Sequence, residues 1–404
     1  MGLAVTAADV EAAASAIGDA ILRTPATPAR TLSEITGAEL FLKFENLQFT
    51  GSFKERGARN FLLHLSPAAR ARGVVAASAG NHALGVAYHA HLLGIPATVV
   101  MPEDTPFTKV TNTQHHDARV VLHGTSFAAA LAEAMRIAHE SGATLVPAFD
   151  DPLVIAGQGT VALELLEQVD DLDVVVIPVG GGGLIAGMAT VIKHRRPSTR
   201  VIGVQVDSYP GMLHALGRTA APTGGPTIAE GIAVVDPGAL TREIVDELVD
   251  GIVTVPESRI EEAVALGIEI EKTVLEGAGA AALAAVLEHA DLVRGQRIAL
   301  VCSGGNIDAR VLTSVLLRAL ARSGRLVRLR IEVPDRPGVL ATIADIVGTR
   351  RANIVDVTHH RDLPGLTLKR AVLEISIETR DRDHANELVA AIDAAGFPVE
   401  VAGP

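Results

Sequence analysis

The sequence predicts an α/β fold in which a large parallel-sheet domain is followed by a smaller antiparallel one. Up to about residue 320, short β-branched runs alternate with helical stretches rich in alanine and leucine. Buried apolar strands separated by helices indicate a parallel sheet covered on both faces. Beyond residue 320, polar and apolar residues alternate, which is typical of strands with one exposed face. Glycine-rich segments follow several strands of the first domain, at the edge where parallel sheets bind ligands.

Six runs in the first domain are predicted to be buried strands. They span Val74–Ala77, Ala97–Met101, Arg119–Leu122, Asp173–Val179, Val201–Val206 and Arg297–Cys302. Between them, apolar residues recur at helical spacing, as in Ser126–Glu140 and Gly159–Gln168. The alternation places helices on the sheet between successive strands.

The last part of the chain has a different order of elements. Its predicted strands and helices are Leu326–Val333 (strand), a helix ending near Arg351, Asn353–His360 and Leu366–Glu378 (strands), Asp383–Ala395 (helix) and Val399–Val401 (strand). The order βαββαβ predicts a ferredoxin-like module over residues 326–404. We expect the preceding domain to span residues 1–320 and the linker to be Ala321–Arg325.

Composition narrows the class of protein. The chain has 404 residues, with 35 Lys and Arg against 47 Asp and Glu, and a net charge of −12. This acidic balance argues against a general electrostatic grip on nucleic acid or an anionic membrane. The single cysteine excludes an internal disulfide, and the 14 histidines show no ligand spacing, so we expect no metal site. No uninterrupted apolar run of about 20 residues occurs, so we expect a soluble, cytoplasmic protein.

Four consecutive glycines form the strongest single motif. Gly180 to Gly183 directly follow the strand Asp173–Val179 and precede a helix predicted over Leu184–His194. Glycines let the backbone approach an oxyanion closely, and the helix N-terminus adds aligned N–H donors and a positive dipole. The motif therefore predicts a phosphate site, with a flexible loop as the plainer alternative.

The glycines alone do not identify the molecule that carries this phosphate. Gly181–Ala186 also satisfies the dinucleotide fingerprint, and Asp207 ends the next strand where a ribose-binding acid belongs. A nicotinamide dehydrogenase is therefore an alternative. Two observations weigh against it: the glycine strand lies in the middle of the domain, and a dehydrogenase leaves the remaining motifs unexplained.

Three further segments carry reactive or polar residues. Thr50–Gly57 places Lys54 in the first turn of a helix, whose dipole favours the neutral amine that a Schiff base requires. Ser78–His82 follow a strand, and their N–H groups suit a carboxylate. Cys302–Asn306 end another strand.

Each of these segments has a plainer interpretation when it is taken singly. Lys54 would be a solvated surface lysine, and Asn81 the cap of a helix. His82 would be a structural histidine. Cys302 is expected to be a buried, inert thiol, since no acidic partner or base stands near it in the sequence.

Together the motifs resemble the pyridoxal-phosphate enzymes of the tryptophan-synthase-β fold, and within them the threonine dehydratases. The resemblance rests on six segments in the family's order: Lys43–Gln48, Gly51–Ala58, Ser78–His82, Ala156–Thr160, Gly180–Leu184 and Ser303–Asn306. It implies a two-lobed fold, with the smaller lobe inserted at roughly residues 50–150. It also implies deamination of L-threonine, and of L-serine, to 2-oxobutanoate or pyruvate and ammonia.

The resemblance assigns a role to each matching position. Lys54 would hold the cofactor covalently and remove the substrate's Cα proton, Phe53 would pack beside the ring, and Ser303 would face the pyridine nitrogen. The remaining cofactor contacts would be Asn81 at the ring oxygen and, around the phosphate, Gly180, Gly181, Gly182, Gly183 and Leu184. The substrate carboxylate would bind Ser78, Ala79, Gly80, Asn81 and His82.

Two positions separate this chain from the related serine racemases. Those enzymes carry a second serine in the substrate loop as the acid–base group of the opposite face, whereas this chain has Ala79. Their metal site begins with a glutamate, whereas this chain has Gln205 after Gly203-Val204. A dehydratase is therefore favoured, with a racemase or another hydroxy-amino-acid lyase as the alternative.

The C-terminal module resembles an ACT domain, an amino-acid-sensing module. The resemblance rests on Asp335–Leu340 and implies an effector site at Asp335, Gly338, Val339 and Leu340, with Asn353 donated by a neighbouring chain. It implies a homodimer or homotetramer and control by a branched-chain amino acid, as expected in isoleucine biosynthesis. A dimerisation device without an effector, and a sensor with a vestigial catalytic domain, remain as alternatives.

Overall fold

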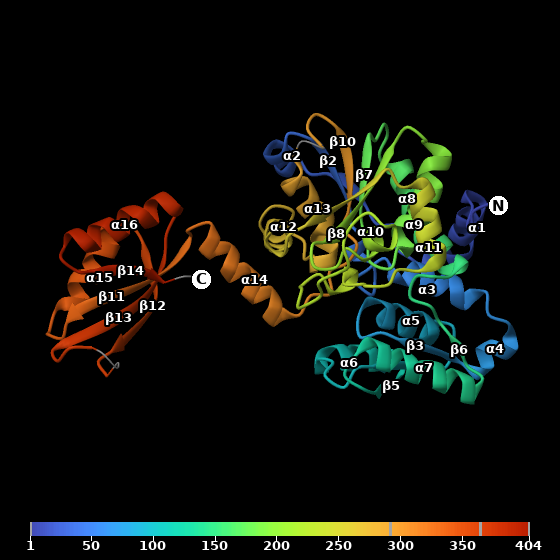
Figure 1. Cartoon of the computed structure of the whole chain (residues 1–404), viewed down its shortest axis with the longest axis horizontal. Helices are drawn as coiled ribbons and strands as arrows, with labels where there is room; N and C mark the ends of the chain where they lie inside the picture. Colours follow the sequence, from blue (N-terminus) through green and yellow to red (C-terminus); the bar gives the residue numbers. More distant parts are fainter. Residues whose placement is uncertain (1, 291–292, 363–365, 403–404) are drawn as a thin grey trace. The chain divides into compact units, whose positions relative to one another are not determined.

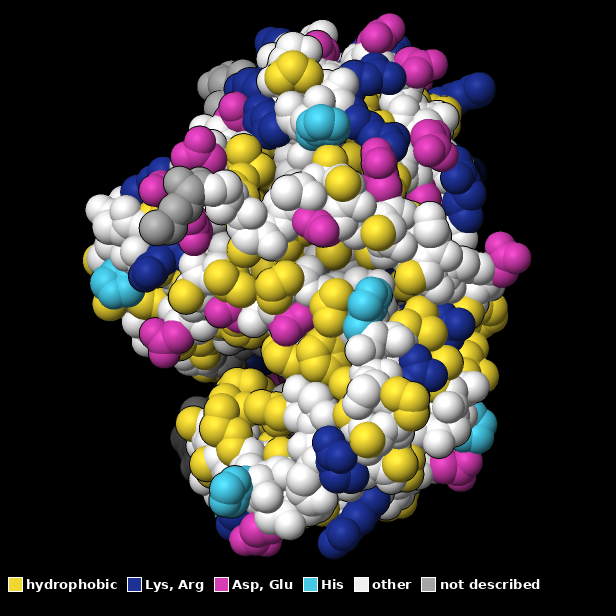
Figure 2. All heavy atoms as spheres, turned by 90° about the vertical axis from the view of Figure 1, so that its right-hand side faces the viewer, with side chains coloured by type: hydrophobic (Ala, Val, Ile, Leu, Met, Phe, Trp, Pro, Cys, Tyr) yellow, Lys and Arg dark blue, Asp and Glu magenta, His cyan; other side chains and the backbone are white. Residues whose placement is uncertain are grey.

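The computed structural model describes residues 2–290, 293–362 and 366–402. The chain forms two compact units, Met1–Ile307 and Asp308–Pro404 (Figure 1). The helix α14 (Ala309–Arg322) belongs to the second unit, so that unit begins ahead of the linker expected at Ala321–Arg325. Within the described residues, no helix is both long and apolar enough to cross a membrane. On the face drawn in Figure 2, acidic and basic side chains are interspersed.

The larger lobe of the first unit is built on a six-stranded sheet in the order β1-β2-β10-β7-β8-β9. All neighbours are parallel except β1 and β2, which are antiparallel. The strands are β1 (Ala26–Pro28), β2 (Glu39–Lys43), β7 (Val174–Pro178), β8 (Arg200–Val206), β9 (Gly251–Val255) and β10 (Arg297–Val301). The predictions for β7, β8 and β10 are confirmed to within a residue at each end, whereas β1, β2 and β9 had not been predicted.

The smaller lobe is a parallel sheet in the order β5-β4-β3-β6. Its strands are β3 (Val74–Ala77), β4 (Ala97–Met101), β5 (Arg119–Leu122) and β6 (Thr144–Leu145), the first three with the predicted bounds. Alternate residues of β3 face opposite sides. Val74 and Ala76 pack in one cluster with α5 (Asn81–Leu92), and Val75 and Ala77 pack in another with α7 (Phe127–Ser141).

Helices cover both faces of the larger sheet (Figure 1). On one face lie α8 (Pro152–Gln168) and α9 (Gly183–Arg195), and on the other α12 (Glu257–Glu269) and α13 (Gly277–Glu288). The sequence of α13, GAGAAALAAVLE, is apolar all round, as expected of a helix buried on every side. The other helices of the unit are α1 (Ala7–Ile17), α2 (Arg30–Thr36), α3 (Lys54–Leu63), α4 (Pro67–Arg72), α6 (Phe107–Gln114), α10 (Gly211–Ala215) and α11 (Ala239–Leu248), with 3₁₀ turns η1 (Gly18–Ala20), η2 (Glu45–Leu47) and η3 (Glu230–Ile232).

The helix α3 connects the two lobes. It packs against α5 of the smaller lobe and against α8 of the larger lobe. The close approach to α5 occurs at Gly85, where a Cβ atom would lie 3.1 Å from the backbone nitrogen of Glu55. The first residues of α3 are therefore held by both lobes at once.

The second unit has the predicted ferredoxin-like order. Its antiparallel sheet runs β12-β13-β11-β14, with the strands β11 (Leu326–Pro334), β12 (Asn353–His360), β13 (Arg370–Glu378) and β14 (Val399–Ala402) and the helices α15 (Val339–Thr349) and α16 (Arg382–Ala394). The strand predicted from Leu366 begins only at Arg370. Lys369 has a φ of 68°, which extended backbone does not adopt, so the ladder cannot continue through it.

Candidate active site

Hydrogen bonds tie the predicted motifs of the first unit to one another. The backbone N–H of Phe53 donates to the Ser303 carbonyl at 3.2 Å, and that of Gly305 donates to Gly51 at 2.9 Å. The Asn306 side chain donates to the Asn81 carbonyl oxygen at 2.7 Å. Three segments far apart in the sequence therefore meet where α3 begins.

Lys54 is the first residue of α3 and is partly buried. Its ammonium nitrogen donates to the Ala148 carbonyl at 2.9 Å and lies 5.3 Å from the centroid of the Phe53 ring. Burial lowers the pKa of Lys54 to about 8, against the opposing charge of Glu276. A substantial neutral fraction of the amine is therefore present near physiological pH, unlike in a solvated surface lysine.

The glycine loop ends in the left-handed backbone conformation that begins α9. Gly182 caps the helix with a φ of 95°, and a Cβ atom there would lie 2.7 Å from Met212 and 2.8 Å from Thr241. The Thr241 hydroxyl donates to the Gly181 carbonyl at 2.7 Å and so turns the loop's carbonyl away from its N–H groups. The first N–H groups of α9 have no partners within the helix, which suits the loop to binding an anion.

The segment between β6 and α8 frames the site, and sequence reasoning had left it unassigned. Asp150 accepts hydrogen bonds from the backbone of Ala239, Leu240 and Thr241 at 2.9–3.2 Å, which caps α11. Asp151 accepts from Leu153 at 2.8 Å and caps α8. The Asp-Pro pair at residues 151–152 is a recognisable helix start. The cap that Asp150 provides for α11 had no local signal, because that helix lies about 90 residues away in the sequence.

The predicted substrate loop lies between β3 and α5. Its Gly80 N–H donates to the Ser78 hydroxyl at 3.1 Å, and Ala79 and Gly80 are partly exposed. The N-cap of α5 is Gly80, so Asn81 is not the cap that its plainer interpretation suggested. Instead the Asn81 amide donates to Glu276 at 2.7 Å.

His82 is placed by contacts of its own. Its imidazole is buried, and its Nε2 lies 3.0 Å from the Val146 carbonyl oxygen. Burial and the nearby charge of Lys54 lower the pKa of His82 to about 4, so the ring is neutral at physiological pH. The side chain has the structural role that was the plainer alternative, and a part for His82 in substrate binding is left to its backbone.

Two buried residues, Cys302 and Ser303, directly follow β10. The Ser303 hydroxyl lies 3.4 Å from the Ala278 carbonyl oxygen, a long contact that leaves the hydroxyl free to serve a ligand. Cys302 is 2% exposed, and burial raises the pKa of its thiol to about 12. The expected inert thiol is confirmed.

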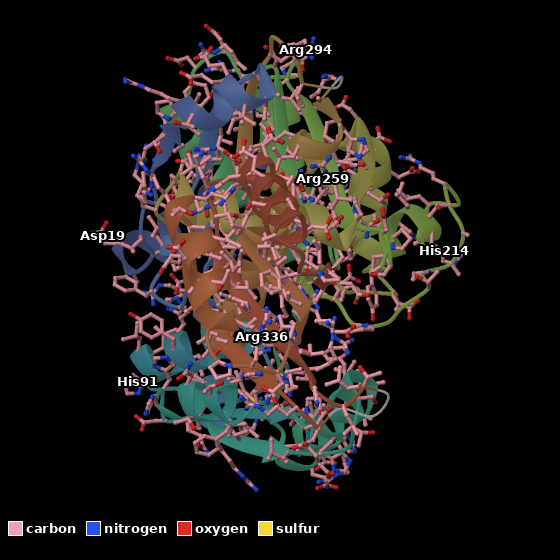
Figure 3. All side chains as sticks on the ribbon, turned by 90° about the vertical axis from the view of Figure 1, so that its left-hand side faces the viewer. Asp19, His91, His214, Arg259, Arg294 and Arg336 are labelled. Atoms are coloured by element: carbon pink, nitrogen blue, oxygen red, sulfur yellow. The ribbon has the colours of Figure 1, made fainter. Side chains whose placement is uncertain are left out.

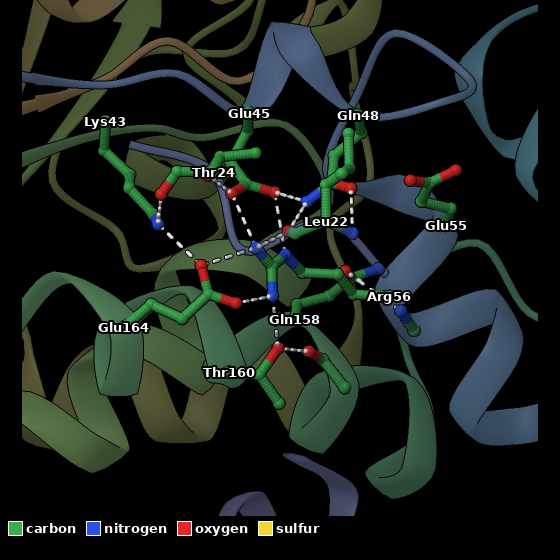
Figure 4. Close-up of polar contacts among 12 residues, drawn as sticks. Leu22, Thr24, Lys43, Glu45, Gln48, Glu55, Arg56, Gln158, Thr160 and Glu164 are labelled. Atoms are coloured by element: carbon green, nitrogen blue, oxygen red, sulfur yellow. Dashed lines mark hydrogen bonds and ion pairs between the residues drawn. The ribbon is translucent and has the colours of Figure 1, made fainter. Parts of the chain in front are cut away.

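A buried ion network lies directly behind the first turn of α3 (Figure 4). The Arg56 guanidinium contacts the Glu45 carboxylate at 2.7 and 2.8 Å and the Glu164 carboxylate at 2.7 and 3.0 Å. Lys43 donates to Glu164 at 2.6 Å, and Thr160 accepts from Arg56 at 3.1 Å. Residues of three segments quoted for the resemblance thus meet Glu164 in one buried network. Nothing in the sequence pairs them, because their partners are up to 121 positions apart.

The predicted effector residues line one pocket of the second unit. Its volume is about 480 Å³, and its lining is Val333, Pro334, Asp335, Arg336, Pro337, Gly338, Val339, Leu340, His359, Arg361 and Leu373. Arg336 is labelled in Figure 3. Gly338 has a φ of 92° and begins α15, a backbone conformation that favours glycine. Asn353, at the other end of β12, is not part of this lining, so its donation by a neighbouring chain stays a prediction.

Five lining residues lie outside the predicted loop Asp335–Leu340, and two of these, His359 and Arg361, have polar side chains. Arg361 contacts the Asp335 carboxylate at 3.2 Å, and His359 lies on β12 opposite Leu373 of β13, another lining residue. Both follow the predicted loop by about 20 residues, and only the fold of the sheet brings them to it. Among residues 2–290, 293–362 and 366–402, no group of three or more His, Cys, Asp or Glu side chains could hold a metal ion.

Comparison with known proteins identifies the family. The profile of the family described as pyridoxal-phosphate dependent enzyme matches residues 17–304. The chain belongs to the pyridoxal-phosphate dependent enzymes. An ACT domain profile matches residues 327–397. The alternative of a nicotinamide dehydrogenase, which the glycine loop alone had allowed, is therefore wrong.

Similar proteins include both lyases and a racemase. The L-threonine ammonia-lyase of Thermotoga maritima is 45% identical over 401 residues, which cover 99% of this chain and all of that protein. The processed form of threonine deaminase isoform 2 from Solanum lycopersicum has a TM-score of 0.73 at 36% identity, over 76% of this chain and 90% of that one. Maize serine racemase has a TM-score of 0.73 at 33% identity, over 79% of this chain and 99% of that one.

The residues present fit pyridoxal phosphate. The cofactor needs a reactive amine, an anion site for its phosphate and a partner for its ring nitrogen. Lys54 supplies an amine whose pKa is about 8, and the glycine loop with the start of α9 supplies unpaired N–H groups. Ser303 supplies a buried hydroxyl with only one long contact.

Proposed function

We propose that this enzyme deaminates L-threonine to 2-oxobutanoate and ammonia, and L-serine to pyruvate and ammonia. The observation that carries the proposal is the Lys54 amine, whose pKa is about 8 and which donates to the Ala148 carbonyl, next to the Phe149 side chain that packs against Gly181 and Gly183 of the glycine loop. The full-length similarity to the L-threonine ammonia-lyase of Thermotoga maritima supports threonine as the substrate.

The residues divide the work of the reaction. Pyridoxal phosphate, when bound, supplies an electron sink that acidifies the Cα–H bond of an amino acid. Lys54 holds the cofactor at rest and takes the Cα proton during turnover, which its lowered pKa permits near neutral pH. Phe53 packs beside the ring, and the N–H groups of Gly183 and Leu184 hold the phosphate.

Ser303 is proposed to favour elimination over other reactions of the same substrate, such as racemisation. A serine hydroxyl next to the ring nitrogen does not hold that nitrogen protonated, as an aspartate would. With such a partner for the ring nitrogen, Ser303 would favour loss of the substrate's β-hydroxyl over other reactions at Cα. The backbone N–H groups of Ser78–His82 hold the substrate carboxylate, as their position at the start of α5 supports.

The racemase alternative is weakened by one position. Racemisation requires a proton donor on each face of the substrate, and at the position where the related racemases carry a serine for the second face this chain has Ala79, whose methyl group cannot donate a proton. A dehydratase therefore agrees better with the residues of the loop.

The second unit is proposed to regulate the first. Asp335, Gly338, Val339 and Leu340 line a pocket large enough for an amino acid, and Asp335 offers a carboxylate to its ammonium group. We propose a branched-chain amino acid as the effector. A homodimer or homotetramer would allow Asn353 of a neighbouring chain to complete the site.

Substrate assays test the proposal directly. Purified enzyme is expected to be yellow and to release 2-oxobutanoate from L-threonine faster than pyruvate from L-serine, with D-serine formed more slowly than either. Borohydride is expected to fix a pyridoxyl group on Lys54, which peptide mass spectrometry detects. A colourless protein that binds no pyridoxal phosphate, or faster formation of D-serine, would contradict the proposal.

Replacement of the lysine tests its role. Lys54→Ala is expected to lower kcat by at least about 10³-fold, because the group that moves the Cα proton is gone. Thermal unfolding and assembly should match those of the wild type, since the Lys54 side chain contributes one hydrogen bond to the fold, to the Ala148 carbonyl. Retained turnover in this variant would refute the role assigned to the lysine.

A further inference from the structure

Glu276 lies at the junction of the segments that form the site, although no motif had pointed to it. It caps α13, and its backbone N–H donates to the Gly304 carbonyl at 3.1 Å. Its carboxylate accepts the Asn81 amide at 2.7 Å. A glutamate at the end of one lobe's helix thus contacts the first residue of α5 in the other lobe.

The Asn81 amide is held from both ends. Its Nδ2 donates to Glu276 at 2.7 Å, and its Oδ1 accepts from Asn306 Nδ2 at 2.7 Å. Asn306 is itself anchored, because the same nitrogen donates to the Thr50 carbonyl at 2.6 Å. An asparagine amide has two donor hydrogens and one carbonyl oxygen. One Nδ2 hydrogen is therefore left for a ligand, and the two neighbours decide where it points.

We propose that Glu276 is a positioning residue for the cofactor: it accepts one hydrogen of the Asn81 amide and thereby directs the other toward the ring oxygen of pyridoxal phosphate. The inference rests on the proposed role of Asn81 as a cofactor ligand. Without Glu276, only Asn306 would hold the amide, which could then rotate about its last side-chain bond, and the carbonyl oxygen would face the oxygen of the cofactor in part of the molecules. An oxygen opposite an oxygen is repulsive, so binding weakens.

A carboxylate is a stronger acceptor here than a neutral group. Charge-assisted hydrogen bonds are shorter and stronger than neutral ones. The charged groups that interact with Glu276 are Lys54 on α3, Lys109 on α6 and Glu230 on η3. Burial raises the pKa of Glu276 to about 7, so both protonation states are present at neutral pH. A protonated carboxyl still offers its carbonyl oxygen to Asn81, so the positioning survives the titration.

Cofactor affinity separates positioning from other roles. Apo protein is titrated with pyridoxal phosphate, and binding is followed by visible absorbance and equilibrium dialysis. Glu276→Ala is expected to raise the dissociation constant about tenfold, the effect of one hydrogen bond of about 1.4 kcal/mol. Glu276→Gln is expected to stay within about threefold of the wild type, because its amide oxygen can accept the same hydrogen.

A matched control uses the other end of the same helix. Glu288 ends α13 and pairs with Arg259, labelled in Figure 3, at 2.7 Å. Glu288→Ala is expected to leave the dissociation constant unchanged. Thermal unfolding of all the apo variants shows whether a change in affinity accompanies a change in fold.

A double-mutant cycle shows whether Glu276 acts through Asn81. In an Asn81→Ala background, Glu276→Ala is expected to change the dissociation constant by less than about twofold, since the positioned group is already gone. An unchanged affinity of Glu276→Ala, a Glu276→Gln variant as weak as Glu276→Ala, or full additivity with Asn81→Ala would each overturn the inference. Failure of the wild-type protein to bind pyridoxal phosphate would instead overturn the proposed function.

Discussion

Two basic residues separated by one position in α3 respond to burial in opposite ways. Burial lowers the pKa of Lys54 to about 8, because the charge of Glu276 only partly offsets it. Burial alone would also lower the pKa of Arg56, but Glu45 and Glu164 outweigh it and raise the pKa. The number of carboxylates within hydrogen-bond distance therefore decides which buried base stays charged. Lys54 keeps an amine available for chemistry, and Arg56 keeps a permanent charge for structure.

The lowered pKa of Lys54 predicts how the apo enzyme recaptures its cofactor. The neutral amine is the form that reacts with an aldehyde. With a pKa of about 8, its fraction rises about tenfold between pH 7 and pH 9 and then levels off. The rate of reconstitution with pyridoxal phosphate should follow this curve, whereas the rate of a free lysine derivative should keep rising toward pH 10.5. A rate that keeps climbing to pH 10.5, the ordinary value for lysine, would contradict it.

Ala79 makes a second prediction at this scale. Its side chain is partly buried on the substrate loop, so a serine hydroxyl would add one atom beside the substrate. Ala79→Ser is expected to form D-serine from L-serine above the wild-type level, measured by chiral chromatography. Ala79→Gly serves as the control, because it alters the loop without adding a donor. Equal D-serine from all three proteins would show that this position does not decide the stereochemical outcome.

At the scale of elements, α3 depends on partners from both lobes. The network around Arg56 fixes its first turn from one side, and Gly85 of α5 meets it from the other. Burial alone would raise the pKa of Glu45, but Arg56 and Lys43 outweigh it and leave the pKa below its ordinary value. The stability that this provides is complete above the ordinary pKa of glutamate and is lost as the pH falls through the lower, folded-state value.

Breaking the network is expected to be costly. Arg56→Leu leaves the buried carboxylate of Glu45 without its main partner, which destabilises the first unit by about 3–5 kcal/mol. Urea unfolding followed by circular dichroism measures this shift. Arg136→Leu removes an equally short but exposed pair with Glu133 and Glu140, so its unfolding curve should stay close to that of the wild type. Similar shifts in both variants would contradict the assignment.

Elements with their own local pattern were predictable, and those that depend on neighbours were not. The β-branched runs of β3, β4 and β5 and the glycines before α9 carry their signals within a few residues. By contrast, β1 has three residues and ends in Pro28, and it is a strand only because β2 pairs with it. Glu276, Asp150 and Arg361 were missed for the same reason. Their partners are 195, 89 and 26 positions away, respectively, and only the fold brings them together.

At the scale of the molecule, the chain combines two units with different kinds of sheet. The first has two sheets that are parallel except for β1, and the second has an antiparallel sheet with a pocket beside α15. The relative from Thermotoga maritima matches along 99% of the chain, so the pairing of the two units is shared with that protein. Regulation is therefore to be tested on the full chain.

The pocket of the second unit predicts loss of the response to an effector. Asp335 is paired with Arg361. A bound amino acid could pair with both residues instead, its ammonium group with Asp335 and its carboxylate with Arg361. Asp335→Ala is expected to raise the isoleucine concentration that gives half of the maximal effect on threonine turnover by at least about tenfold. This is the effect of losing one charge-assisted hydrogen bond. Glu387→Ala on the exposed side of α16 is the control. A wild-type response from Asp335→Ala would place the effector elsewhere.

The ion network behind Lys54 also limits how such sequences can diverge. Two cations, Lys43 and Arg56, are balanced by Glu45 and Glu164, and the four side chains come from three separate segments. A single charge-changing substitution would leave an unmatched charge in the interior. Natural relatives that lose Arg56 should therefore also lose Glu45 or Glu164, and an alignment of many homologues should show these positions changing together. Correlated changes at these four positions would show that folding, and not contact with the substrate, limits which residues they can carry.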